Sequence, residues 1–160
     1  MSRINISLSS QAADLFGSDG KLIKRYPVST SKYGAGERNG SFCTPRGMHI
    51  VRAKIGAGQP QNAVFVERRP TGELYTSELA EKFPGRDWIL TRILWLSGCE
   101  VGFNRLGDVD TMRRFIYIHG SPDNVAMGKP GSIGCIRMHN KDLMDLFERV
   151  EAGDEVFIAD

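Results

Sequence analysis

The feature that most constrains this 160-residue chain is a two-residue alternation of apolar and polar side chains in short runs between turn-forming residues. Ile4, Ile6 and Leu8 alternate with polar residues from the start. Successive side chains of a strand point to opposite faces, so this period predicts strands with one buried face. We expect strands over residues 4–8, 22–28, 48–55, 63–67, 88–96, 115–118 and 155–158.

The segments between these runs predict how they connect. Residues 17–20 are rich in turn formers, so we expect 4–8 and 22–28 to form an opening hairpin. Residues 29–46 have no periodicity and predict a long surface loop.

Two segments have helical features. Ser77 is a suitable N-cap for a short helix that Pro84 would end. The clearest helix is 141–150, where Asn140 is a plausible N-cap and one face is apolar: Leu143, Leu146, Phe147 and Val150. The fold class expected for residues 1–160 is therefore a single, mainly β domain, a β-sandwich or partly closed barrel with one or two helices.

Composition excludes several functions. Lys and Arg number 21 and Asp and Glu 19, which leaves little net charge to attract nucleic acid. The longest apolar run, 88–96, is interrupted by Thr91 and Arg92, so no membrane span is expected. The first residues alternate instead of forming a secretory leader, and the cysteine count is odd: Cys43, Cys99 and Cys135. Both features favour a cytoplasmic, reducing location.

Two short segments can carry chemistry. His119 follows an apolar run, and sixteen positions later Cys135 lies in a glycine-containing turn. A histidine within reach can accept the thiol proton and leave a reactive thiolate. Gly120 would permit a tight turn and leave its carbonyl free to orient the imidazole, while the N–H groups of Gly134 and Cys135 would form an oxyanion hole. Arg137 offers donors for a substrate carboxylate.

Other interpretations remain open on the residues alone. Cys135 can be a small buried apolar residue, His119 can cap a strand, and Arg137 can form a surface ion pair. A metal site would combine Cys135 with His139, four positions later, and with His119 or His49. No second cysteine or acidic residue stands at ligand spacing, so we expect no metal and no cofactor.

The two segments together resemble the active-site signature of the L,D-transpeptidase (YkuD) catalytic domain family. That signature is His-Gly, a spacer of about fifteen residues, and Ser/Thr-His-Gly-Cys followed by an apolar residue and Asn or Arg. Here it is matched by Ile118-His119-Gly120 and by residues 132–138. Residues 26–30, 44–47, 92–96 and 110–111 also look like segments of the family, so the resemblance covers essentially the whole chain.

The resemblance implies a role for each matched residue. Cys135 would be the nucleophile and His119 its base, oriented by the Gly120 carbonyl, and the Gly134 and Cys135 N–H groups would hold the oxyanion. The substrate-binding residues would be Arg137, Ser132 and Ile133, with Arg92 and Trp95 on the far side of the pocket. Ile133 departs from the family, which has histidine at this position; isoleucine has no proton to give.

The implied substrate is a murein tetrapeptide or muropeptide, attacked at the bond after the third residue, typically meso-diaminopimelate, with release of D-alanine. Water as acceptor makes the enzyme an L,D-carboxypeptidase, and an amine makes it a transpeptidase. We expect a cytoplasmic L,D-carboxypeptidase of peptidoglycan recycling. The alternatives are an exported, periplasmic L,D-transpeptidase that forms 3–3 cross-links or exchanges D-amino acids, and a non-catalytic peptide- or glycan-binding domain.

Overall fold

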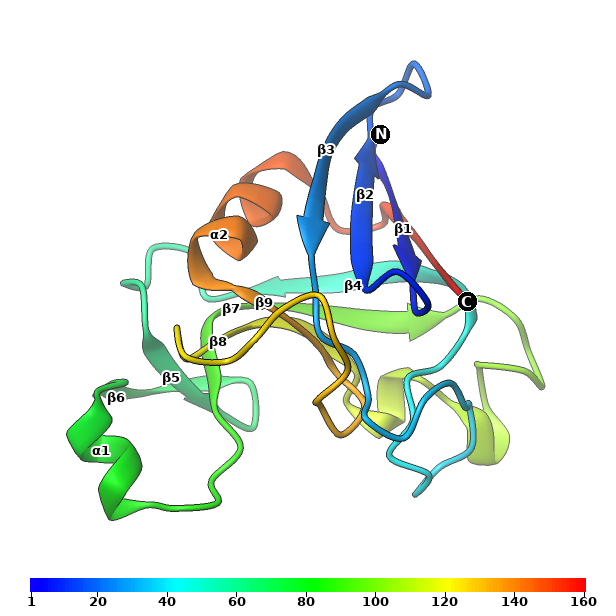
Figure 1. Ribbon diagram of the computed structural model, residues 1–160. Coiled ribbons are helices and arrows are strands. Elements are labelled where there is room, and N and C mark those ends of the chain that lie inside the picture. The colour runs from blue at the N-terminus through cyan, green and yellow to red at the C-terminus, as the bar shows by residue number, and fades with distance from the viewer.

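The computed structural model describes residues 1–160, and its strands form one strongly curled sheet, a half-barrel that confirms the expected mainly β fold (Figure 1). The sheet order is β3-β2-β1-β10-β4-β7, and β7 also pairs with β5, which continues to β6, and with β8, which continues to β9. The strands are β1 Arg3–Ser7, β2 Ala12–Phe16, β3 Leu22–Pro27, β4 Gly47–Ile55, β5 Ala63–Val66, β6 Arg69–Leu74, β7 Ile89–Gly98, β8 Tyr117–Ser121, β9 Ile136–His139 and β10 Glu155–Ala159.

Two helices accompany the sheet, α1 (Ser77–Lys82) and α2 (Asn140–Arg149), together with two 3₁₀ turns at Gly107–Val109 and Met112–Arg114. Neither helix has the length and apolar character that crossing a bilayer requires. α2 packs its apolar face against the inside of the curled sheet (Figure 1), where the fully buried Leu143 and Leu146 join the main core. Burial of a leucine side chain contributes about 2 kcal/mol, so this contact keeps α2 on the sheet.

β7 is the central strand, since it pairs with β4, β5 and β8. It is apolar on both faces because both are covered, as its sequence predicts. Its register against β8 slips between Leu90 and Ile93, so Thr91 and Arg92 form a bulge.

The predicted hairpin between residues 4–8 and 22–28 is wrong, because these two strands do not pair with each other. The first strand pairs with β2, which the sequence analysis missed, and the turn at 17–20 joins β2 to β3. Ala12 and Ala13 give β2 too little contrast between its faces for the alternation to be visible. β6 and β9 were also missed, whereas every predicted strand is present with shifted ends.

Two predicted helix caps are also wrong. Thr76, not Ser77, caps α1, because its hydroxyl accepts the Leu79 N–H at 3.1 Å. Asn140 is the first residue of α2 instead of its cap, and its side chain bonds residues of other elements. In both helices the cap lies one residue before the predicted one, a shift that residue type alone does not resolve.

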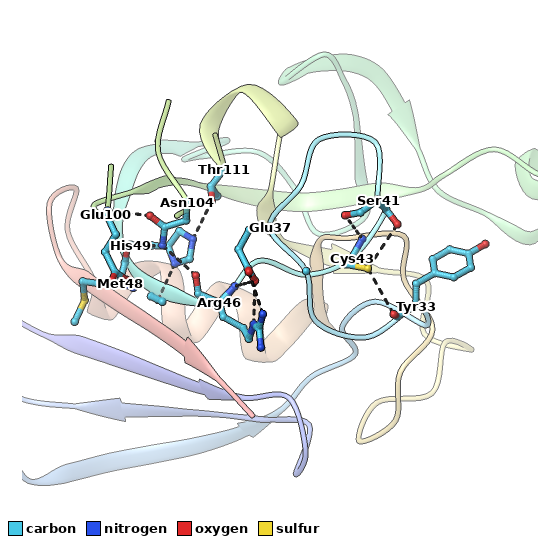
Figure 2. A network of polar contacts seen from close by, with 12 residues as sticks. Tyr33, Glu37, Ser41, Cys43, Arg46, Met48, His49, Glu100, Asn104 and Thr111 are labelled. Carbon is cyan, nitrogen blue, oxygen red and sulfur yellow. Dashed lines mark hydrogen bonds and ion pairs between the residues drawn. The ribbon is translucent and has the colours of Figure 1, made fainter. Parts of the chain in front are cut away.

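A polar network ties β4 to the loop that follows β7 (Figure 2). His49 is fully buried; its Nδ1 lies 3.0 Å from the Gly47 carbonyl oxygen and its Nε2 3.0 Å from the Thr111 hydroxyl. Asn104 donates to the Arg46 and Met48 carbonyls at 3.0 and 3.1 Å. Burial lowers the pKa of His49 to about 4, so the imidazole is neutral in the folded protein.

His49 makes stability depend on pH. Its pKa is lower in the folded state than the usual 6.5, so its contribution is complete above pH 6.5 and is lost as the pH falls toward 4. The loss reaches about 3 kcal/mol, and the buried His119 acts in the same direction. In urea unfolding at pH 7.5 and 4.5, His49→Gln should therefore show a smaller drop in stability than the wild type. His139→Gln is the control, and an equal drop for His49→Gln would contradict this assignment.

Candidate active site

The parallel pairing of β8 with β9 brings the two predicted segments together. Ile118 lies opposite Ile136 and His119 opposite Arg137. Ile118 and Ile136 belong to the main core, so His119 and Arg137 point to the other face. Cys135 stands two residues before Arg137 and is directed to this same face, where it packs with Tyr117.

His119 is held in one tautomer. Its side chain is 1% exposed, and its Nδ1 lies 2.7 Å from the Gly120 carbonyl oxygen. A carbonyl only accepts, so Nδ1 carries the proton and Nε2 is left as a proton acceptor. Burial lowers the pKa of His119, against the opposing effects of Asp87 and the Gly120 carbonyl, so the ring is neutral and can act as a base.

The Gly120 carbonyl contacts His119 Nδ1, as expected. The predicted tight turn at Gly120 is wrong, because His119 and Gly120 both lie inside β8. Glycine is needed here for a different reason. A Cβ atom would collide with Asn140 Oδ1 and lie 2.6 Å from the Leu90 carbonyl oxygen. Its neighbours therefore leave no room for a side chain at position 120.

The Cys135 thiol is neutral at rest. Its Sγ lies 3.3 Å from the Tyr117 N–H and 3.4 Å from the Phe115 carbonyl oxygen, to which it donates. Burial raises the pKa of the Cys135 thiol to about 12, although the Tyr117 N–H and the nearby guanidinium of Arg114 oppose the shift. Thiolate formation therefore requires the thiol to exchange its Phe115 partner for a base.

The turn before Cys135 is locked by hydrogen bonds. Gly134 has φ +133°, which disfavours any other residue. Its N–H donates to Ser132 Oγ at 3.2 Å, Ser132 Oγ donates to the Cys135 carbonyl at 2.6 Å, and Thr44 donates to the Gly134 carbonyl at 2.9 Å. Ser132 is thus a buried structural residue. The Cys135 N–H has no protein acceptor and is free for an oxyanion, whereas the Gly134 N–H is engaged.

Arg137, which is expected to bind substrate, lies opposite His119 on the same face of the β8–β9 ladder, but it is not among the residues that line the cavity in front of the thiol. Its Nη2 donates to Ser29 Oγ at 3.1 Å, while its buried Nε has no partner. Arg92 lies away from the pocket, because its buried guanidinium donates to the Gln59 and Thr91 carbonyls.

Trp95 supports the pocket from behind. Its indole N–H donates to the Met112 carbonyl at 3.2 Å, and its ring packs edge-on against Tyr117. The Arg68 guanidinium lies 4.9 Å from the Trp95 ring centre.

A cavity of about 520 Å³ opens in front of the thiol. Ile133 lies at its rim with its side chain 47% exposed. The lining combines apolar, acidic and basic side chains: Phe42, Glu67, Arg68, Asp87, Ile89, Arg114, Phe115, Ile116, Tyr117, Ile133 and Cys135. A mixed lining of this kind suits a ligand that carries charges of both signs.

Two arginines of this cavity, Arg68 and Arg114, are not predicted from the sequence. Arg68 and Arg114 each belong to an Arg-Arg pair, which suggests a solvated strand end. Arg68 instead donates to the Tyr117 hydroxyl at 2.9 Å and stacks on the Phe115 ring. Arg114 donates to the Gly36 and Cys43 carbonyls at 3.1 and 2.6 Å and so anchors the 29–46 loop beside the site. No sequence signal separates these arginines from their exposed neighbours.

The alternative metal set is not assembled. His49 bonds Gly47 and Thr111, and no group of three His, Cys, Asp or Glu side chains that could hold a metal ion occurs. All three cysteines are free thiols.

A curled β-domain with a buried His–Gly pair and a thiol at the floor of a cavity defines the class of protein. Residues 2–158 match the L,D-transpeptidase catalytic domain family, YkuD, and the chain belongs to this family. The resemblance predicted from the sequence is thereby confirmed.

Among curated relatives, the YkuD protein of Bacillus licheniformis is 27% identical over 156 residues, covering 98% of this chain and 64% of that protein. The YkuD protein of Bacillus subtilis is 49% identical over 94 residues, covering 59% of this chain and 47% of that protein. The YqjB protein of Bacillus subtilis is 40% identical over 60 residues, covering 38% and 32%. The chain thus spans less than two thirds of the length of these relatives.

Solved structures show the same fold. L,D-transpeptidase 3 from Mycobacterium tuberculosis superposes with a TM-score of 0.60 at 16% identity, covering 99% of this chain and 60% of that one. The C442S mutant of the Enterococcus faecium L,D-transpeptidase gives 0.59 at 16% identity, covering 99% and 49%.

The geometry predicts how Cys135 responds to charge. Burial is the main cause of the raised pKa of the Cys135 thiol, and the negative charge of Asp87 raises it further. Asp87→Asn should lower that pKa and speed alkylation of Cys135 by iodoacetamide at pH 8, because thiolate is the reacting species. Peptide mapping by mass spectrometry separates Cys135 from Cys43 and Cys99. Asp123→Asn, an exposed change outside this cavity, is the matched control, and equal rates for both variants would refute the assignment.

Proposed function

We propose that the protein cleaves the bond after the third residue of a murein tetrapeptide stem through a Cys135 thioester and so releases D-alanine. The observation that carries the proposal is the bond from His119 Nδ1 to the Gly120 carbonyl, which leaves Nε2 as a base on the face where Cys135 meets the cavity. Membership of the L,D-transpeptidase family supports this chemistry.

Each step of the reaction uses a group described above. The thiol proton moves to His119 Nε2 as sulfur attacks the substrate carbonyl carbon. The Cys135 N–H stabilises the resulting oxyanion. Its collapse breaks the C–N bond, and His119 gives the proton to the departing amine of D-alanine. His119 then takes a proton from water, and the water oxygen attacks the thioester carbon. The C–S bond breaks, and His119 gives the proton to the Cys135 sulfur, which restores the thiol.

The charges around the cavity support a stem peptide as substrate. Such a peptide carries free carboxylates and, when its third residue is a diamino acid, a side-chain ammonium group. Arg114 and Arg137 are half-buried cations on the site face, and Glu67 and Asp87 are exposed acidic residues on the cavity wall. Half-buried arginines bind carboxylates well because their donors are pre-organised and partly desolvated.

We infer that water is the preferred acceptor. Ile133 places an apolar side chain at the rim, where the family usually has a histidine, so no second imidazole is available to take a proton from an incoming amine. We also propose that the enzyme acts in the cytoplasm, and the three free thiols support a reducing compartment. The second candidate is transpeptidation, which is favoured by the names of the structural neighbours.

The two candidates differ in their products. Purified protein is incubated with a disaccharide tetrapeptide, with and without excess D-amino acid, and the products are identified by mass spectrometry. Hydrolysis predicts tripeptide in both reactions, and a dominant exchange product would contradict it. Cys135→Ala should lower the rate at least about 1,000-fold, while Cys99→Ala, which removes an exposed thiol, should keep it. Full activity of Cys135→Ala would exclude the thioester mechanism.

The acceptor preference depends on residue 133. Ile133→His should keep D-alanine release and raise amine transfer relative to hydrolysis, because an added imidazole can deprotonate the acceptor. The ratio of exchange product to tripeptide is the measurement, with Ile133→Gln as a polar control of similar size. An unchanged ratio in Ile133→His would show that Ile133 does not determine the preference for water over an amine.

A further inference from the structure

A strained residue lies opposite the catalytic pair of β8. Thr91 has φ +76°, a left-handed conformation that a β-branched residue rarely adopts. It belongs to the β7 bulge, which faces His119 and Gly120 in the register. Such a conformation is strained and persists only where the surroundings fix it.

The surroundings of Thr91 hold both its side chain and its carbonyl. Its buried hydroxyl donates to Asn140 Oδ1 at 2.7 Å and accepts the Asn62 N–H at 3.0 Å. Its carbonyl accepts from the Arg92 guanidinium at 2.6 Å. The Thr91 hydroxyl therefore offsets the strain with two hydrogen bonds, of which the one to Asn140 is buried.

Asn140 carries this contact to β8. Its side chain is buried, and Nδ2 donates to the Ser121 carbonyl at 2.9 Å and to Asn62 Oδ1 at 3.0 Å. Ser121 directly follows Gly120 in β8. One asparagine from the start of α2 thus joins the bulge of β7 to the carbonyl of Ser121, the residue that follows Gly120.

Gly120 is enclosed by the same groups. An added Cβ would collide with Asn140 Oδ1 and would lie 3.2 Å from Thr91 Cβ. The backbone of Gly120 therefore packs directly on the network, and its carbonyl on the other side accepts from His119 Nδ1.

We propose that Thr91 and Asn140 are positioning residues that aim the Gly120 carbonyl at His119 Nδ1 and so keep Nε2 unprotonated for the thiol of Cys135. A neutral imidazole exchanges its proton between two nitrogens, and the partner of one nitrogen decides which tautomer is present. Bulges beside active sites commonly re-aim a neighbouring group. The inference rests on the proposed function only in taking His119 as the base.

The decisive variant is Thr91→Val, which keeps the shape of the side chain and removes the hydroxyl. In protein labelled with ¹⁵N-histidine, the wild-type His119 should show the Nδ1–H tautomer and the variant a mixture, with His119→Gln used to assign the signals. We expect kcat for D-alanine release to fall about 10- to 100-fold with KM little changed. Thr91→Ser restores the hydroxyl and should recover the wild-type tautomer and most of kcat.

Thr111→Val is the matched control. It also removes a buried threonine hydroxyl that bonds a buried histidine, but the histidine is His49 (Figure 2). It should lower the melting temperature and leave the His119 tautomer and kcat unchanged. If Thr91→Val does not fold, Thr91→Gly removes both the strain and the hydroxyl and permits the same measurements.

Retention of a pure Nδ1–H tautomer at His119 in Thr91→Val, or in Thr91→Gly, would overturn the proposal. The spectra require no substrate, so the two proposals fail separately. A shifted tautomer in a protein whose wild type releases no D-alanine would support the positioning role and refute the proposed function.

Discussion

The parallel ladder between β8 and β9 is the constraint on which the site depends. Because side chains alternate along a strand, one face of this ladder buries Ile118 and Ile136 in the core, and the other presents His119 and Arg137. A slip of one residue would move the imidazole into the core and an isoleucine into the cavity. Packing of the core therefore sets the register of β8 against β9, and this register places His119 and Arg137 on the face opposite the core.

The proposed base and nucleophile, His119 and Cys135, are both uncharged at rest. Burial disfavours the imidazolium of His119 and the thiolate of Cys135, so proton transfer between them would create two charges in a poorly solvated place. The free Cys135 N–H and the nearby Arg114 and Arg137 oppose that penalty once negative charge develops on the substrate. This favours proton transfer concerted with attack over a preformed ion pair.

The sequence predicted what depends on short-range pattern. Alternation predicts most of the strands, helical spacing predicts α2, and the His119 and Cys135 segments indicate the family, which the match to the family confirms. β2 was missed because its alanines show little contrast, and Arg68 and Arg114 because their partners, Tyr117 in β8 and Cys43 in the 29–46 loop, are distant in sequence. Arg92 is expected at the pocket, but its guanidinium donates to the Thr91 carbonyl in the β7 bulge and to the Gln59 carbonyl in the loop between β4 and β5. The strain at Thr91 leaves no trace in residue type, since threonine is ordinary in a strand.

The neutral thiol of Cys135 has a consequence for the life of the protein in a cell. Peroxides and disulfides attack thiolates, and a cysteine at its ordinary pKa already exposes a few per cent of that form at neutral pH. Because burial holds Cys135 protonated, the fraction open to oxidation is far smaller. The burial that makes a base necessary in the proposed mechanism therefore also protects the sulfur from irreversible damage while no substrate is bound.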